Sequence, residues 1–274
     1  MEWMNPSVLF AAVDPIAFCI GPVCVRWYGL LIATALLIGA IGGCYACRKA
    51  GIDEDDFLTI FMAMAVAAII GARAYYVIFN LNYYLSNPLE IFNLREGGLA
   101  IYGGIIGGAL TIYGFCKIKK IDMLSYLDLM IPSVALAQGF GRIGCFLAGC
   151  CYGKETDAWY GMEFNHSVYQ NMIGVKVIPT QLVMCVANFA HFFLLVFIAN
   201  KVYKTGKDGV VAGCYLLFYS IGRFLIEFLR DDPRGGVGTL STSQFISLFI
   251  FAAGMLMVLF FGLRKGKDIA ASGS

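Results

Sequence analysis

Residues 241–263 read STSQFISLFIFAAGMLMVLFFGL, a stretch without a single charged side chain. An α-helix needs about 20 apolar residues to cross the hydrocarbon core of a bilayer, and this stretch is long enough. Similar apolar segments occur at 27–46, 57–80, 98–116, 126–147, 181–200 and 210–230. The sequence therefore predicts an all-α polytopic membrane protein with seven transmembrane helices.

The composition agrees with a membrane protein. Of the 274 residues, 59% are hydrophobic and 14% are charged, and the mean hydropathy is +0.75. Soluble domains average about 45–50% apolar and about 25% charged residues. The 32 glycines suit transmembrane helices whose backbones approach closely. We expect a single integral-membrane domain over residues 1–274. No basic stripe with interleaved aromatic residues is present, so no nucleic-acid partner is expected.

Basic residues gather between the apolar segments on one side of this pattern. More than half of the 20 Lys and Arg residues fall in four clusters, namely Arg48/Lys49, Lys117/Lys119/Lys120, Lys201/Lys204/Lys207 and Arg264/Lys265/Lys267. Because loops rich in Lys and Arg stay in the cytoplasm, we expect the N-terminus outside and the C-terminus inside. The first residues lack the features of a removable signal peptide, so none is expected.

Seven arginines fall instead in or just beyond the external halves of the segments. They are Arg26, Arg73, Arg95, Arg142, Arg223, Arg230 and Arg234. A guanidinium stays charged and binds phosphate through two parallel hydrogen bonds, so a lipid phosphate in the outer leaflet is a fitting partner. Snorkelling to headgroups or structural ion pairing is the alternative, which stays equally open for Arg26, Arg95 and Arg234.

Two motifs hold arginines in polar or glycine-rich surroundings. Residues 141–153 read GRIGCFLAGCCYG, with Arg142 bracketed by glycines at the end of an apolar segment. Residues 219–230 read YSIGRFLIEFLR, and a continuous helix would put Arg223, Glu227 and Arg230 on one face. This triad leaves one net positive charge and could hold a phosphate, or it could be a buried structural cluster.

These motifs resemble those of the prolipoprotein diacylglyceryl transferase family, along nearly the whole chain. The similarity covers IGPVCVRWYGL at 20–30, GAR at 71–73, YYL at 83–85, NPLEIF at 87–92 and EGGLAIYGG at 96–104. It continues through GRIGCF at 141–146, Gly153, PTQL at 179–182 and the Arg223, Glu227 and Arg230 set. The resemblance implies seven spans with a small extracytoplasmic head over about 150–178.

The resemblance also implies an activity. The family transfers a diacylglyceryl group from phosphatidylglycerol to the lipobox cysteine thiol in the signal peptide of a prolipoprotein, and releases glycerol phosphate. Such an enzyme would lie in the bacterial cytoplasmic (inner) membrane, among membrane lipids, with its active site facing the extracytoplasmic side. No cofactor is expected.

Site residues follow from the motifs and the resemblance together. We expect Tyr102, Arg142 and Arg223 to be catalytic, with the two arginines binding the lipid phosphate and stabilising the leaving group. Substrate-binding or supporting roles are expected for Arg73, Gly103, Gly104, Gly144, Cys145, Gly153, Glu227 and Arg230. In this scheme Glu227 and Arg230 orient and balance the phosphate site, and Gly103, Gly104 and Gly144 leave room for the lipid.

The chain departs from the family pattern at several positions. Tyr102 stands where the family commonly has histidine, and the two histidines, His166 and His191, lie outside matching motifs. A histidine base and a metal site are therefore not expected. Tyr102 could accept the thiol proton as a phenolate, hydrogen-bond the lipid, or only pack on glycines.

Cysteines mark further departures. Cys145 replaces the signature asparagine, and Ala148 and Cys150 replace polar residues that often follow. Small apolar packing is the expected role for most of the ten cysteines. A covalent intermediate on Cys145 is disfavoured because a thioether is a poor leaving group. Other functions remain open: a paralogue with another acceptor, or a non-enzymatic lipid transporter. A channel is disfavoured because no internal repeat is clear.

Overall fold

The computed structural model describes residues 15–21, 23–93, 97–165, 167, 169–230 and 236–264. Arg95, His166, Arg234, Lys265 and Lys267 lie outside these ranges, as does the Lys204 side chain.

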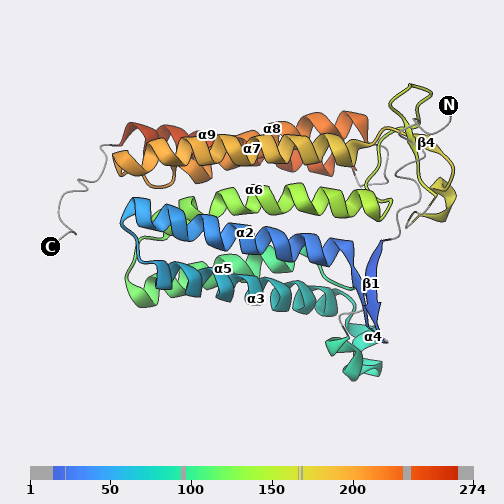
Figure 1. Cartoon of the computed structure of the whole chain (residues 1–274), viewed down its shortest axis with the longest axis horizontal. Helices are drawn as coiled ribbons and strands as arrows, with labels where there is room; N and C mark the ends of the chain where they lie inside the picture. The colour runs from blue at the N-terminus through green and yellow to red at the C-terminus, as the bar shows by residue number, and fades with distance from the viewer. Residues whose placement is uncertain are drawn as a thin grey trace. The chain divides into compact units, whose positions relative to one another are not determined.

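Within the described ranges, seven helices are long and apolar enough to span a bilayer (Figure 1). They are α2 (Trp27–Ala50), α3 (Glu54–Phe79), α5 (Ile101–Lys119), α6 (Met123–Leu147), α7 (Thr180–Val202), α8 (Val210–Ile226) and α9 (Thr242–Leu263). The all-α, seven-span prediction is confirmed, with ends shifted by a few residues.

Contacts within the chain divide it into two units, which we describe separately. One runs from Gly43 to Leu127, and the other holds the residues up to Gly42 together with those from Asp128 onward. The expectation of one domain over 1–274 stays a prediction.

The unit from Gly43 to Leu127 is built on the close pairing of α3 and α5. A Cβ atom on Gly103 or Gly107 would overlap backbone oxygens of α3, those of Gly71 and Ala67 respectively. Such contacts need glycine because the two backbones touch where side chains would stand. The loop after α3 contains the short helix α4 (Leu81–Ser86) and the 3₁₀ turn η2 (Pro88–Phe92).

The other unit has its core between α6, α7 and α8. Ala135, Leu195 and Val211 are fully buried there. Asp128 of α6 is 1% exposed and accepts hydrogen bonds from the backbone N–H groups of Gly209 (2.8 Å) and Ala212 (2.8 Å). A carboxylate at a helix N-terminus is favoured by the unpaired N–H groups and the helix dipole, so Asp128 fixes the start of α8.

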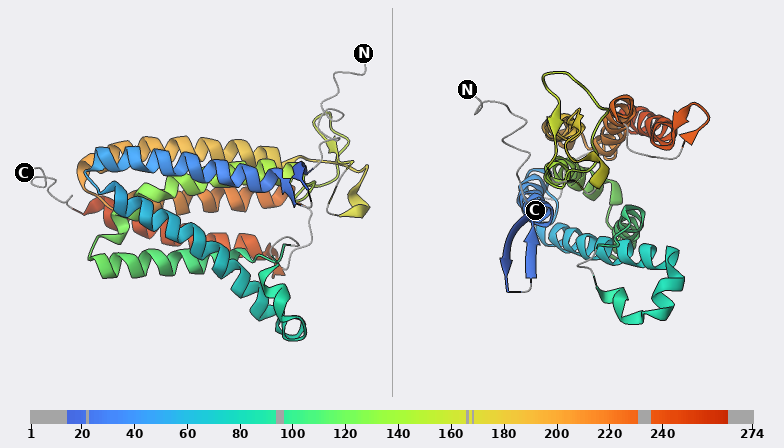
Figure 2. Two further views of the ribbon diagram at one scale, coloured as in Figure 1. Left: turned by 60° about the horizontal axis from the view of Figure 1, so that its bottom comes forward. Right: turned by 90° about the vertical axis from the view of Figure 1, so that its right-hand side faces the viewer.

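Short antiparallel ribbons precede α2 or lie between later helices of this unit. They pair β1 (Ile16–Ile20) with β2 (Val23–Arg26), β3 (Met162–Glu163) with β4 (Lys176–Val177), and β5 (Gly236–Val237) with β6 (Leu240–Ser241). The right-hand view of Figure 2 shows β1 and β2 as a two-stranded ribbon in blue. A disulfide joins Cys19 to Cys24 across it. These two cysteines are thus exceptions to the apolar packing expected for most of the ten, which the buried Cys47, Cys116, Cys185 and Cys214 follow.

The segment between α6 and α7 corresponds to the expected head. It contains β3, the 3₁₀ turn η3 (Gln170–Met172) and β4. A small core of Phe146, Tyr152, Phe164 and Val177 holds it to the end of α6. The boundaries 150–178 and the extracytoplasmic location stay predictions.

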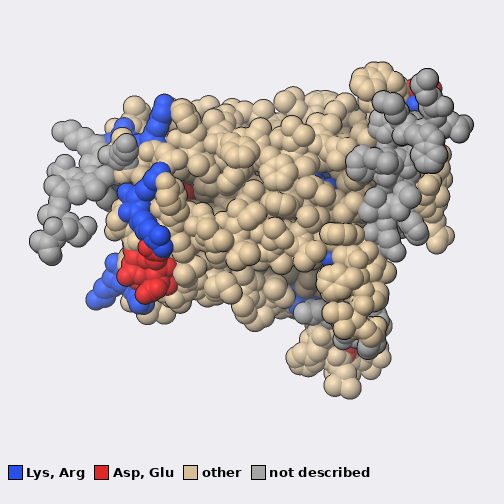
Figure 3. Space-filling model, in the orientation of Figure 1, with Lys and Arg blue, Asp and Glu red and all other residues tan. Residues whose placement is uncertain are grey.

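Basic residues gather at helix ends, as the clusters in the sequence indicate. Arg48 and Lys49 lie in the last turn of α2, Lys117 and Lys119 in that of α5, and Lys201 in that of α7. On the face drawn in Figure 3, charged side chains are concentrated at such ends, and the flanks of the helices are largely uncharged. Orientation in a bilayer remains a prediction from this pattern.

Candidate functional site

Arg142 lies in the last turns of α6, close to the point where α2 packs against Gly144. A Cβ atom on Gly144 would overlap the Tyr28 ring, so Gly144 allows the first turn of α2 to pack against α6. The charge of Arg142 acts on Tyr28 and Cys145. Arg142 is partly exposed, and within the described ranges it makes no hydrogen bond or ion pair. Within the described ranges, no carboxylate is paired with its positive charge.

Arg223 is held from two sides. Its Nη1 pairs with the Glu227 carboxylate one helical turn along, and its Nη2 donates to Ser243 Oγ at 2.6 Å. The side chains of Arg223 and Glu227 are 10% and 8% exposed. The predicted Arg223–Glu227 neighbourhood is confirmed. Glu227 balances the charge of Arg223, and Glu227 and Ser243 together fix the position of its guanidinium.

Arg230 does not share that helical face, which corrects the prediction from a continuous helix. After Ile226 the chain tightens into the 3₁₀ turn η5 (Glu227–Leu229), and Arg230 itself is extended. Its Nη1 lies 3.8 Å from Met184 Sδ on α7. Its backbone bridges to Gly153 instead.

Gly153 joins the head segment to the end of η5. A Cβ atom on Gly153 would lie 2.6 Å from Leu229 O and 2.7 Å from Thr180 Cγ2. Its N–H donates to Ile178 O at 2.9 Å. The space beside Gly144 and Gly153 is thus filled by the protein, and these glycines allow close packing rather than leaving room for a lipid.

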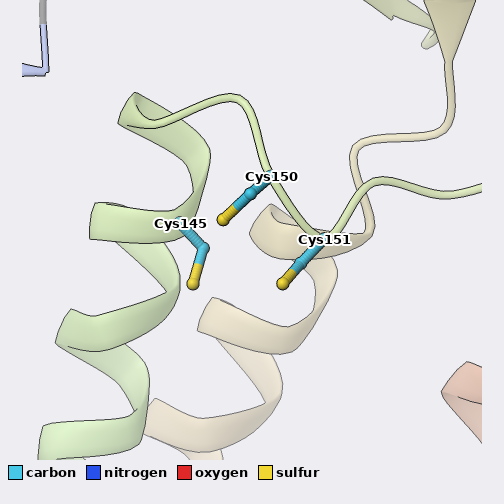
Figure 4. A group of neighbouring side chains, drawn as sticks. All are labelled: Cys145, Cys150 and Cys151. Atoms are coloured by element: carbon cyan, nitrogen blue, oxygen red, sulfur yellow. The ribbon is translucent and has the colours of Figure 1, made fainter. Parts of the chain in front are cut away.

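Three thiols converge where α6 ends. The Sγ atoms of Cys145, Cys150 and Cys151 all lie within 4.8 Å of one another, and Figure 4 shows Cys145 on the helix facing Cys150 and Cys151 on the loop that follows. Cys151 has a positive φ of 62°, which costs energy in any residue with a Cβ. The buried side chains of Thr180 and Gln181 donate to the carbonyls of Cys151 (2.9 Å) and Cys150 (2.8 Å).

The two loop thiols differ in acidity. Hydrogen bonds from Cys145 and Cys150, with a further one from Arg230, lower the pKa of Cys151 because they stabilise its thiolate. Its own contacts with Cys145 and Cys151 raise the pKa of Cys150, since a second negative charge there is disfavoured. The sequence showed these cysteines but not their convergence.

In the other unit, Arg73 uses all five of its N–H donors on backbone carbonyls. Nε donates to Ile91 (2.8 Å), Nη1 to Gly97 and Gly98 (3.0 Å each), and Nη2 to Glu90 (2.6 Å) and Asn93 (2.9 Å). The guanidinium also lies 5.2 Å from the Tyr84 ring centroid. With every donor engaged, Arg73 holds the segment after α4 and has no N–H left for a phosphate.

Tyr102 stands on the first turn of α5, in the same unit as Arg73. Its side chain is 58% exposed, and its ring centroid lies 6.4 Å from that of Tyr75. The neighbouring Gly103 lies in the contact between α3 and α5, and a Cβ atom on Gly104 would lie 3.2 Å from Ala68 O of α3. Gly103 and Gly104 thus serve helix packing, while a chemical role for Tyr102 stays a prediction.

Sequence reasoning missed several residues around Arg142, Arg223 and the thiols. Tyr28, Thr180, Gln181 and Ser243 all support the groups described above. For Tyr28, Thr180 and Gln181 the signal available was their place in the matching segments at 20–30 and 179–182, whereas Ser243 lies in no such segment. Only the fold brings the starts of α2 and α7 to the end of α6, and the start of α9 to Arg223 of α8, within this unit.

Comparisons with known proteins agree with these motifs. A family model described as prolipoprotein diacylglyceryl transferase matches residues 15–260. A phosphatidylglycerol–prolipoprotein diacylglyceryl transferase from Clostridium tetani is 40% identical over 92% of this chain and 100% of its own length. Its counterparts from Clostridium perfringens and Clostridioides difficile are 41% and 38% identical, over 88% and 94% of this chain and 93% and 99% of their own lengths. The chain therefore belongs to the prolipoprotein diacylglyceryl transferase family.

Proposed function

We propose that this multi-pass membrane protein transfers a diacylglyceryl group from phosphatidylglycerol to the lipobox cysteine of prolipoproteins, the first step of lipoprotein maturation. The single observation in this chain that supports the proposal concerns the surroundings of Arg142. Its partly exposed guanidinium lies near the end of a spanning helix and makes no hydrogen bond or ion pair within the described ranges. The names of the relatives supply the substrates.

In the proposed reaction, Arg142 binds the phosphate of phosphatidylglycerol through paired N–H donors. The acceptor thiol loses its proton to water, and its sulfur attacks the carbon of the diacylglyceryl group that carries the phosphate. The C–O bond breaks, and its electron pair leaves on the phosphate oxygen of glycerol phosphate. Preorganised positive charge at this oxygen lowers the barrier, and such electrostatic stabilisation is often the largest catalytic contribution.

The remaining site residues support this step. The Arg223–Glu227 pair and Ser243 are held by hydrogen bonds to one another. They are proposed to supply fixed polar groups that need not reorganise as negative charge develops on the leaving phosphate. Tyr102 is proposed to contact the incoming thiol or the glyceryl oxygen. We place the reaction at the extracytoplasmic side of the bacterial cytoplasmic membrane, because the basic clusters mark the opposite helix ends as cytoplasmic.

The test is transfer with purified protein. Protein in detergent is mixed with phosphatidylglycerol and a lipobox peptide, and the peptide is weighed by mass spectrometry. We expect a diacylglyceryl mass gain that a peptide with Ala in place of Cys does not show. Glycerol phosphate release without peptide gain would indicate a different acceptor, and intact lipid would refute the transferase.

Arg142→Ala should abolish the gain while the protein still inserts and folds. The matched control is Arg48→Ala, since Arg48 is an exposed arginine whose partner is Glu54 at a helix end. Normal turnover by Arg142→Ala would refute the phosphate-binding role.

A further inference from the structure

Three cysteines at the proposed active site form a cluster that the phosphate-binding scheme leaves unused. Cys145 ends α6, whereas Cys150 and Cys151 lie in the turn that follows. All three side chains are partly exposed. The other free cysteines of the described ranges include Cys47, Cys116, Cys185 and Cys214, which are buried. Convergence with partial exposure distinguishes the cluster from cysteines that merely fill space.

The geometry suits a tetrahedral metal ion. Zinc binds thiolate sulfur at about 2.3 Å, so two sulfurs on one tetrahedral ion lie about 3.8 Å apart. The three Sγ atoms are within 4.8 Å of one another before any ion draws them in. Small rotations about the side-chain bonds close that difference. Three protein ligands with a fourth position left open are the pattern of catalytic zinc sites.

The surroundings hold the ligands in place. The left-handed backbone at Cys151, with φ of 62°, lets two consecutive cysteines place their sulfur atoms near that of Cys145. Thr180 and Gln181, both 0% exposed, bind the carbonyls of Cys151 and Cys150. Backbone strain kept by buried hydrogen bonds is typical of functional sites. Supporting hydrogen bonds of this kind orient ligands in metal centres.

Charge also fits. Three thiolates with Zn²⁺ carry one net negative charge, and the guanidinium of Arg230, 6% exposed, lies within hydrogen-bonding reach of Cys151. The thiols also share surroundings with the proposed phosphate ligand, because Tyr28 interacts electrostatically with Arg142 and with all three cysteines.

We propose that Cys145, Cys150 and Cys151 bind Zn²⁺, and that the acceptor thiol of the transfer reaction takes the fourth ligand position. This inference rests on the proposed function for its substrate. Transfer needs an acceptor sulfur without its proton. Arginines cannot accept a proton at ordinary pH, and Glu227 is engaged by Arg223. A thiol that coordinates zinc loses its proton, here to water.

The step balances without a redox partner. The zinc-bound sulfur forms a C–S bond to the glyceryl carbon as the C–O bond to phosphate breaks, and glycerol phosphate leaves with that electron pair. Zinc keeps its charge throughout. The product thioether is uncharged and binds zinc weakly, so it leaves and a new thiol replaces it.

The experiment measures metal content directly. Protein carrying a tag that does not bind metals is purified anaerobically, and zinc is quantified by elemental mass spectrometry. We expect about one zinc per chain. Cys145→Ser, Cys150→Ser and Cys151→Ser should each lower this content, and the triple variant should abolish it. The matched control Cys44→Ser, which alters a partly exposed cysteine outside the cluster, should keep full zinc and full transfer.

Cobalt supplies a readout independent of activity. Co²⁺ in place of zinc should give thiolate-to-cobalt absorption, and a lipobox peptide should change that spectrum while its Cys→Ser version should not. Metal-free wild-type protein, equal zinc in wild type and triple variant, or another metal at stoichiometric level would overturn the proposal. Wild-type protein that transfers without zinc refutes only this inference, whereas zinc-loaded protein that leaves phosphatidylglycerol intact refutes the proposed function.

Discussion

Replacing Arg73 by lysine tests whether this arginine organises a loop or binds substrate. Arg73 is 8% exposed and donates five hydrogen bonds to carbonyls spread from Glu90 to Gly98. Lysine has three donors on a single nitrogen, so at least two carbonyls lose their charged partner. Hydrogen bonds to charged groups contribute about 1.5–3 kcal/mol each, which gives a local loss of about 3–6 kcal/mol.

Hydrogen–deuterium exchange in detergent micelles is the direct assay for this loss. Amides of residues 89–93, 97 and 98 should lose protection in Arg73→Lys, since local opening of this loop becomes less costly. Arg48→Lys is the matched control, because Arg48 is exposed and contacts a side chain rather than a buried loop. Unchanged protection together with reduced transfer would refute the loop-holding role and restore the predicted role in substrate binding.

Three further substitutions test how the helices are joined. Gly103→Ala should lower the melting temperature, at a cost of about 1–3 kcal/mol, because the added Cβ would meet the Gly71 carbonyl. Gly114→Ala is the control, since a Cβ atom there meets nothing within 4 Å. Equal melting temperatures of the two variants would contradict the packing role of Gly103. Asp128→Asn should cost about 1.5–3 kcal/mol, since an amide nitrogen cannot accept from Gly209 or Ala212, and unchanged thermal unfolding would contradict this. Ser241→Ala removes the capping box of α9 and should cost about 0.5–2 kcal/mol, which Ser241→Asp should largely restore. The same melting temperature for both Ser241 variants would argue against the cap.

The spanning helices could be predicted because bilayer thickness imposes their length and excludes charge from their middles. The arginine and glycine motifs could likewise be found, since both residue types are conspicuous at the end of an apolar segment. The prediction that Arg230 shares a helical face with Arg223 and Glu227 was wrong for a local reason. At Arg230 the assumption of helical spacing broke down, because the chain leaves α8 through a 3₁₀ turn.

The thiol cluster and the disulfide could not be predicted for a related reason. Cys145 and Cys150 are brought together by a turn whose backbone N–H at Cys150 binds the Cys145 carbonyl at 3.1 Å. Cys151 then takes a left-handed conformation that the sequence does not favour for cysteine. Cys19 and Cys24 pair only because β1 and β2 form a ribbon. Conformations held by distant hydrogen bonds leave little trace in local sequence.

Arginines that look alike in the sequence differ in what their surroundings leave them able to do. Arg73 donates all five of its N–H groups to backbone carbonyls, and the charge of Arg223 is balanced by Glu227. Arg230 is buried beside the sulfur atoms of Met184 and Cys151. Arg142 alone among these four is partly exposed without an ion pair or hydrogen bond in the described part of the chain. A lipid phosphate carries a full negative charge, and its binding is favoured most by a cation not already compensated. Transfer should therefore be far more sensitive to Arg142→Lys, which keeps the charge but loses the paired donors, than to Arg223→Lys, which keeps a partner for Glu227.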